Sequence, residues 1–304
     1  MPSRSSFDAS PTVSATSSPL SIDELDGRSR RLLKARHHDM DKMEIQTNTL
    51  TAMLHSEAIK FTVYKLQIRS TARLADAGEW ALIKRYSEFF YFRQQLLKLF
   101  QKWDLQFHDD TKRVQCKEFA LASALLLPAL EIPTFPRKHM RCDTQAIVKE
   151  RRNKLQQFVR KMLDAYTDMS VFLHDTQSRN TRAFANLNGM LVLLEEFLDI
   201  PQVQKEINRR QTAAVLALED VDVEQCTDSD CTDRTCCICL NDYDSDEEGP
   251  EVVDEFKDRM VKLPCSHQFH EDCVIDWFNT STTCPLCRKP AFTEQEWSFD
   301  VSIR

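Results

Sequence analysis

Four pairs of cysteine and histidine residues near the carboxyl end of the chain have spacings suited to metal binding. In chain order these pairs are Cys236 and Cys239, Cys265 and His267, His270 and Cys273, and Cys284 and Cys287. A C-x2-C spacing lets two thiolates on one tight turn converge on a tetrahedral zinc ion at sulfur–zinc distances of about 2.3 Å. Eight ligands complete two four-ligand sites with no open position for water, and such closed sites are structural rather than hydrolytic. The spacing therefore predicts two structural zinc ions.

The other cysteines do not fit this pattern. Nine of the 11 cysteines lie between residues 226 and 287, and in a reducing compartment such crowding indicates metal ligands rather than disulfides. Cys237 cannot replace Cys236 without shrinking the C-x2-C spacing, so we interpret it as a packed or exposed thiol. Cys226 and Cys231 are interpreted as free thiols in an acidic loop.

Charge is distributed unevenly along the 304 residues. Residues 55–200 carry 23 Lys and Arg against 17 Asp and Glu, whereas the whole chain has a net charge of -7. A basic middle segment suggests contact with anions, although the same excess is also compatible with an ordinary solvated surface. Residues 219–263 hold sixteen acidic and four basic side chains. This argues against a zinc-dependent nucleic-acid binder, because phosphate binding needs concentrated cations.

The periodicity of apolar residues predicts an α+β fold. Alternation predicts three strands in an antiparallel meander, over residues 44–54, 60–70 and 80–86. Helices are predicted from Ser87 to about Trp103, over Phe119–Leu130, from Asp143 to about Tyr166, and over residues 190–198 and 202–218. The Ser-rich residues 1–30 are predicted to be disordered, and the charged stretch from Arg28 to Asp41 fits either a short helix or a continued tail. No apolar run reaches 18 residues and the amino terminus lacks the apolar core of a secretion signal, so we expect a soluble intracellular protein.

Residues 236–287 resemble a RING finger of the type with two histidines. The resemblance implies alternate bracing, with a first zinc ion on Cys236, Cys239, His270 and Cys273 and a second on Cys265, His267, Cys284 and Cys287. RING fingers of this kind bind a ubiquitin-conjugating enzyme loaded with ubiquitin. The family's docking surface matches Ile238, Trp277 and Pro285, and Arg288 matches an arginine that contacts both ubiquitin and the conjugating enzyme. The acidic gap between the first two ligand pairs is longer than in compact members and is expected to loop out.

Residues 43–200 resemble a phox-homology (PX) domain. The resemblance rests on Arg85-Tyr86 at a strand end, on a proline-rich loop followed by Arg137 and Lys138, and on Arg151 in a helix. The family binds phosphoinositides, most often phosphatidylinositol 3-phosphate. By this resemblance Arg85 takes the 3-phosphate and Tyr86 packs beneath the inositol ring. Lys138, with Arg137 as a competitor, meets the phosphate that links inositol to glycerol, and Arg151 hydrogen-bonds the ring hydroxyls. The alternative is that Arg85 and Arg151 form internal salt bridges in a protein-binding scaffold.

The two resemblances divide the chain into five parts. These are a disordered tail (1–42), a PX domain (43–200), a helical and acidic linker (201–233), a RING finger (234–291) and a C-terminal tail (292–304). Together they imply a RING-type ubiquitin ligase that is cytoplasmic and peripheral on endosomal membranes containing phosphatidylinositol 3-phosphate. It would position a ubiquitin-loaded conjugating enzyme for transfer to a lysine of an unidentified protein substrate. The alternative is an adaptor in endosomal trafficking whose RING mediates only protein–protein interaction, but the matching docking residues favour the ligase.

Overall fold

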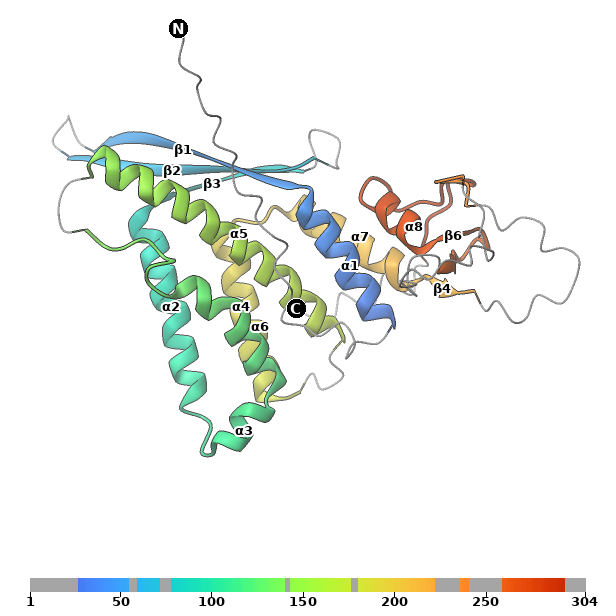
Figure 1. The fold of residues 1–304 in the computed structure, drawn as a ribbon, viewed down its shortest axis with the longest axis horizontal. Coiled ribbons are helices and arrows are strands. Elements are labelled where there is room, and N and C mark those ends of the chain that lie inside the picture. Colours follow the sequence, from blue (N-terminus) through green and yellow to red (C-terminus); the bar gives the residue numbers. More distant parts are fainter. Residues whose placement is uncertain are drawn as a thin grey trace, which may run out of the picture.

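The computed structural model describes residues 27–54, 59–71, 78–139, 143–175, 180–221, 236–240 and 259–292. In this part of the chain, a three-stranded sheet with several long helices forms the larger unit, and a small sheet with one short helix forms the other (Figure 1). The α+β class predicted from the sequence is confirmed. None of the described helices combines the length and apolar character needed to cross a membrane.

The larger sheet is the predicted antiparallel meander. Its strands are β1 (Met43–Leu54), β2 (Ile59–Ser70) and β3 (Glu79–Arg85). Tyr64, Leu66 and Ile68 alternate along β2, and each is fully buried on the face that meets the helices. Leu82 of β3 pairs with Leu66 and is also fully buried. The period-2 pattern therefore identified the strands, and the structure shows which side of β2 faces the helices.

In the described residues, six helices follow this sheet before the chain enters the small unit. They are α2 (Tyr86–Asp104), α3 (Asp110–Gln115), α4 (Lys117–Leu130), α5 (Gln145–Asp175), α6 (Arg182–Phe197) and α7 (Gln202–Leu216). Aromatic side chains link several of these helices. The Phe92 ring of α2 stacks on Phe197 of α6 with 3.7 Å between centroids, and Phe158 of α5 meets Phe92 edge-on. The core thus ties α2, α5 and α6 together beneath the sheet.

Several predicted helix boundaries are wrong. Helix α5 continues nine residues past Tyr166, because Met169, Val171 and Leu173 extend its buried face. Helix α6 begins at Arg182, eight residues before the predicted start, and the Thr181 hydroxyl caps it by accepting from the backbone N–H of Phe184 at 3.1 Å.

Two further findings concern helix ends. Helix α2 is capped at Arg85 rather than Ser87, because the Glu88 carboxylate accepts a hydrogen bond from the Arg85 backbone N–H at 2.7 Å. Pro128 lies inside the last turn of α4. The predicted helix over Phe119–Leu130 is confirmed as most of α4.

The prediction of a disordered tail over residues 1–42 is wrong for its last part, and of the two alternatives for the charged stretch from Arg28 to Asp41 the helix is confirmed. Helix α1 (Gly27–Asp41) occupies it and leads directly into β1. Leu32, Leu33 and Ala35 are nearly or fully buried, because α1 packs on α5 and α7. Figure 1 shows α1 and α7 between the larger unit and α8. Residues 1–26 lie outside the described part of the chain.

The small unit contains a second antiparallel sheet and one helix. Its elements are β4 (Glu219–Asp220), β5 (Met260–Lys262), β6 (Gln268–His270) and α8 (Glu271–Phe278). Strand β4 follows α7 by two residues and pairs with β5, so Glu219 lies opposite Lys262. The segment predicted as a linker is therefore helical in α7 but also supplies a strand to the small unit.

Candidate functional site

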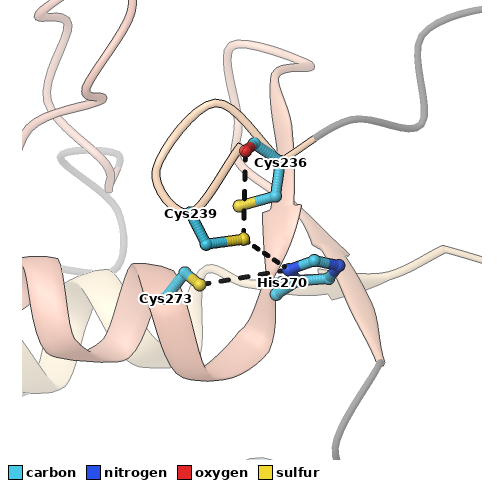
Figure 2. Close-up of side chains that lie close together, drawn as sticks. All are labelled: Cys236, Cys239, His270 and Cys273. Carbon is cyan, nitrogen blue, oxygen red and sulfur yellow. Dashed lines mark hydrogen bonds between the residues drawn. The ribbon is translucent and has the colours of Figure 1, made fainter. Parts of the chain in front are cut away.

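The first predicted group of metal ligands comes together where a tight turn meets α8. Cys236 and Cys239 lie on the turn, His270 ends β6, and Cys273 stands in the first turn of α8. Their ligand atoms all lie within 4.8 Å of one another. Figure 2 shows the Cys239 and Cys273 thiols directed to His270 Nδ1, at Sγ–Nδ1 distances of 3.2 and 3.9 Å. The chain therefore presents three sulfurs and one imidazole nitrogen to one point.

The second predicted group has the same composition. Cys265, His267, Cys284 and Cys287 place their ligand atoms within 4.8 Å of one another. The Nδ1 atom of His267 lies 3.3 Å from Cys265 Sγ and 3.5 Å from Cys284 Sγ. In chain order the ligand pairs alternate between the two groups. The cross-braced grouping that the resemblance implied is the grouping found.

Both groups fit zinc. A tetrahedral ion with zinc–sulfur bonds of about 2.3 Å and zinc–nitrogen bonds of about 2.0 Å separates the two ligand atoms by about 3.5 Å. The four sulfur–nitrogen distances given above scatter around this value. Three cysteines and one histidine form a common structural zinc set and leave no position for a water ligand. The two clusters thus fit two zinc ions with a structural role.

Left-handed backbone follows three of the cysteine ligands. Leu240, Ser266 and Arg288 have φ angles of 61°, 68° and 58°. The backbone N–H of Leu240 donates to Cys236 O at 2.7 Å, and that of Arg288 donates to Cys284 O at 3.0 Å. These bonds close each C-x2-C turn around its thiolates. A non-glycine residue pays about 1–2 kcal/mol for this conformation, and no glycine marked these positions in the sequence.

The predicted docking residues lie on the turns and helix of the finger. Trp277 of α8 is half-buried, and its indole Nε1–H donates to Thr283 O at 2.7 Å, which fixes the ring. Ile238 and Pro285 are half-buried within the two C-x2-C turns, and Arg288 is exposed. Leu286, between Pro285 and the last ligand, is 53% exposed. A partner can therefore reach apolar surface beside an exposed guanidinium.

Two of the predicted lipid residues are in contact at the start of α2 and α5. The Arg151 guanidinium lies 3.9 Å from the centroid of the Tyr86 ring, and burial raises the pKa of Tyr86. The Tyr86 hydroxyl donates to Pro136 O in the proline-rich loop at 2.8 Å. Arg151 Nη1 also donates to Asp143 Oδ1 at 2.6 Å, and the arginine is 4% exposed. The salt bridge envisaged as an alternative thus exists for Arg151.

The other two predicted lipid residues are exposed. The Arg85 guanidinium lies over the Phe61 ring of β2, with 3.6 Å to the centroid, and Lys138 Nζ lies 5.2 Å from the Phe90 centroid. Asp143 was missed as a member of this region. It was predicted only as the start of a helix, and its pairing with Arg151 depends on how the loop folds over α5. The roles of these residues in lipid binding stay predictions.

Comparison with known families agrees with this architecture. Residues 72–171 match the PX domain, and residues 234–288 match the Ring finger domain. The chain therefore combines a PX domain with a RING finger of the two-histidine type. The boundaries predicted for the two domains extend beyond these matches and stay predictions.

Several curated proteins are similar to part of this chain. The E3 ubiquitin-protein ligase Iruka of Drosophila melanogaster is 43% identical over 54 residues, which cover 18% of this chain and 11% of that protein. RING finger protein 122 of Homo sapiens is 31% identical over 70 residues, covering 23% of this chain and 38% of that protein. An uncharacterized RING finger protein of Caenorhabditis elegans is 29% identical over 113 residues, which cover 34% of this chain and 68% of that protein. No solved structure matches the chain at a significant level.

Proposed function

We propose that this protein is a RING-type ubiquitin ligase that works at membranes containing phosphatidylinositol 3-phosphate. The observation that carries the proposal is the finger itself. Two closed metal clusters hold Ile238, Trp277, Pro285 and Arg288 on turns and a helix where a partner can reach them. The similarity to a protein named as an E3 ubiquitin-protein ligase supports the same activity.

The transfer would proceed by positioning. When bound, the two zinc ions supply folding free energy and hold the turns that carry the docking residues. Ile238, Trp277 and Pro285 would seat the conjugating enzyme, while the planar fork of Arg288 would bridge the enzyme and its ubiquitin. The thioester is then kept in a reactive geometry for a substrate lysine. The ligand cysteines are committed to metal, so ubiquitin would pass directly from the conjugating enzyme to the lysine.

The PX domain would supply the location. Arg85 is exposed at the end of β3 and can meet the 3-phosphate through charge-assisted hydrogen bonds. Lys138 is exposed on the proline-rich loop, and Tyr86 and Arg151 form a stacked pair beside it. We propose that these residues hold phosphatidylinositol 3-phosphate on the cytoplasmic face of endosomes. The partners would be this lipid, a ubiquitin-conjugating enzyme, ubiquitin and a protein substrate, with no nucleic acid.

The ligase activity is tested by reconstitution. The purified chain is mixed with ubiquitin, activating enzyme and a panel of conjugating enzymes, and ubiquitin chains are followed on gels. We expect chains with at least one conjugating enzyme and a large loss in Arg288→Ala and Trp277→Ala. Lys289→Ala, which changes the exposed neighbour of Arg288, is the matched control and should keep activity. Failure of the wild-type chain with every conjugating enzyme would contradict the ligase and favour the adaptor.

The lipid pocket is tested by liposome sedimentation. Vesicles with and without phosphatidylinositol 3-phosphate are compared, together with vesicles that contain each of the other phosphoinositides. Arg85→Ala should bind the vesicles that contain phosphatidylinositol 3-phosphate much more weakly than wild type does. Lys98→Ala removes an exposed cation from α2, outside the predicted pocket, and should bind as wild type does. Equal binding by Arg85→Ala and wild type would remove the pocket.

A further inference from the structure

We propose that α1 fastens the RING finger to the PX domain, so that both move as one body. The finger would then hold the conjugating enzyme in a fixed direction relative to the lipid-binding face. The fastening itself follows from contacts among α1, α7, β4 and α8. The consequence for how the conjugating enzyme is oriented rests on the proposed function. The fastening is therefore tested by measurements that do not depend on ubiquitin transfer.

A buried arginine forms the centre of the contact. Arg31 of α1 is 2% exposed, and its Nε–H donates to Glu271 Oε2 at 2.9 Å. The same guanidinium pairs with Asp220 of β4 and reaches the Leu218 carbonyl at 3.4 Å. Glu271 is itself 7% exposed. A buried charge is tolerated where its partners are supplied, and here the partners come from α8 and from the connection after α7.

Further basic side chains lie beside this arginine on α1. Arg31, Lys34 and His38 follow at helical spacing on one side of α1. Lys34 pairs with Asp272 of α8. This carboxylate lies in the first turn of α8, where the helix dipole already favours an acid. An acid at this position is therefore explained by α8 alone, without the contact to α1.

Asp276 of α8 is stronger evidence for the contact with α1. It stands near the carboxyl end of α8, where the helix dipole disfavours an acid. It pairs with Lys42, directly after α1, and its Oδ1 lies 3.5 Å from His38 Nδ1. The complementary charges along α1 and α8 therefore account for an acid that the finger alone does not explain.

A buried chain of polar side chains joins α1, α7 and the end of α8. Gln211 of α7 is 0% exposed, and its Nε2–H donates to Asn279 Oδ1 just after α8 at 2.8 Å. Its side-chain oxygen accepts from Arg36 Nη1 of α1, also at 2.8 Å. Asn279 is 3% exposed. Separating the finger would leave these polar atoms without their partners, which is costly for buried groups.

The hydrophobic core also crosses the boundary. One continuous cluster contains buried side chains from α1, α5 and α7 and from the finger. Its members include Leu32, Leu33, Ala35, Val171, Ala214, Val215, Leu218, Val261, Phe269, Val274, Ile275 and Phe278. A finger on a free tether would expose the apolar side of this cluster to water. Instead, the two residues between α7 and β4, Ala217 and Leu218, are both buried.

The predicted docking surface stays accessible in this arrangement. The α8 residues that meet α1 and α7 are Glu271 and Asp272 at its start, Asp276 near its end, and Asn279 just beyond it. Trp277 directs its indole N–H to Thr283 within the finger, and Leu286 and Arg288 are exposed. The finger is thus attached through one side of α8, while Leu286 and Arg288 remain exposed and Ile238, Trp277 and Pro285 remain half-buried.

Charge reversal tests the fastening. One variant carries Lys34→Asp and Lys42→Asp, a second carries Asp272→Lys and Asp276→Lys, and a third combines all four changes. In each of the first two, amide exchange in α1 and α8 should rise about tenfold or more as the contact opens more easily, and small-angle scattering should show a larger maximum dimension. The combined variant should recover the wild-type profile, because the pairs re-form with reversed sign.

Two measurements keep the result unambiguous. Zinc content must stay at two ions per chain, which shows that the finger is folded. Lys98→Asp with Lys102→Asp, the same change of charge on the exposed end of α2, should leave exchange in α1 unchanged. Should a reversed variant lose zinc, Lys42→Ala gives a milder test with a smaller rise in exchange. Wild-type exchange and dimensions in the reversed variants, or no recovery in the combined one, would overturn the proposal.

Discussion

Arg288 combines two features that oppose each other. Its backbone is left-handed, which a glycine or asparagine adopts more easily, yet its exposed side chain is the donor proposed to bridge ubiquitin and the conjugating enzyme. A costly backbone at an exposed position suggests that the side chain is kept for function. The backbone geometry and the side chain can be separated by substitution.

Arg288→Asn is expected to keep the stability of the finger, since asparagine tolerates a left-handed backbone. It should slow ubiquitin discharge from a preloaded conjugating enzyme by roughly 10- to 100-fold, because a charge-assisted hydrogen bond contributes about 1.5–3 kcal/mol. Ser266→Asn, at another left-handed position, is the matched control for both measurements. Discharge at the wild-type rate in Arg288→Asn would contradict the bridging role.

Asp143 places a negative charge beside a pocket proposed for an anionic lipid. Its carboxylate holds Arg151 at 2.6 Å. Asp143→Asn should therefore strengthen binding to phosphoinositide vesicles by about two- to fivefold, the range expected when a partly exposed charge interaction is removed. Liposome titrations measure this, with Asp110→Asn on α3 as an exposed control. Weaker binding would show instead that Asp143 helps by orienting Arg151.

The functional residues were most predictable where their spacing along the chain determines their role. All eight zinc ligands follow from short intervals along the chain, and their grouping followed from the resemblance to a family. The partner of Arg151 could not be predicted in this way, because a salt bridge depends on how a loop returns to a helix. The same holds for Arg31, whose partners lie about 190 and 240 residues further along the chain.

At the scale of elements, α1 was the least predictable part of the fold. Its few apolar residues gave a weak stripe, and its cations resemble a solvated surface until α8 is placed beside them. The strands of the meander were predictable because they alternate cleanly. The end of α5 was not, since Thr167 and Asp168 interrupt its apolar pattern although both are buried.

The contact of α1 with α5 should depend on pH. His37 Nε2 lies 2.7 Å from Asp168 Oδ1, and this hydrogen bond raises the pKa of His37 against the opposing effect of burial. Burial raises the pKa of Asp164 to about 6, while Arg160 acts to lower it. Asp41 also faces this group and favours the charged histidine.

Both groups hold protons more tightly in the folded chain. The His37 contribution is present below the ordinary pKa of 6.5 and is lost as pH rises through the raised value. The contribution of Asp164 to stability decreases as pH rises from its ordinary pKa of 3.8 to its raised pKa of about 6. Protection of α1 against amide exchange, corrected for intrinsic rates, should therefore decrease from mildly acidic to mildly alkaline pH. His37→Gln should flatten this dependence above pH 6.5, whereas His108→Gln, at an exposed loop, should leave it unchanged.

At the scale of the whole molecule, two hydrophobic clusters should respond differently to zinc removal: the core beneath the larger sheet, and the cluster that α1, α5 and α7 share with the finger. Chelation should unfold the finger, because its own core is small. The shared cluster should then open, so α1 and the end of α7 lose protection against amide exchange, while β2 and its inner residues Tyr64 and Leu66 keep theirs. Unchanged exchange in α1 after chelation would show that α1 keeps its packing without a folded finger, and it would contradict this prediction.

The short connection between α7 and β4 has a consequence for the choice of target. A transfer centre on a long tether samples a wide volume and can meet lysines at many heights above a bilayer. One that is joined to the lipid-binding domain through two buried residues and a paired strand samples a thin layer. In the ligase proposed above, the bilayer would serve as a reference plane, and a lysine would be selected by its height above that plane more than by the sequence around it.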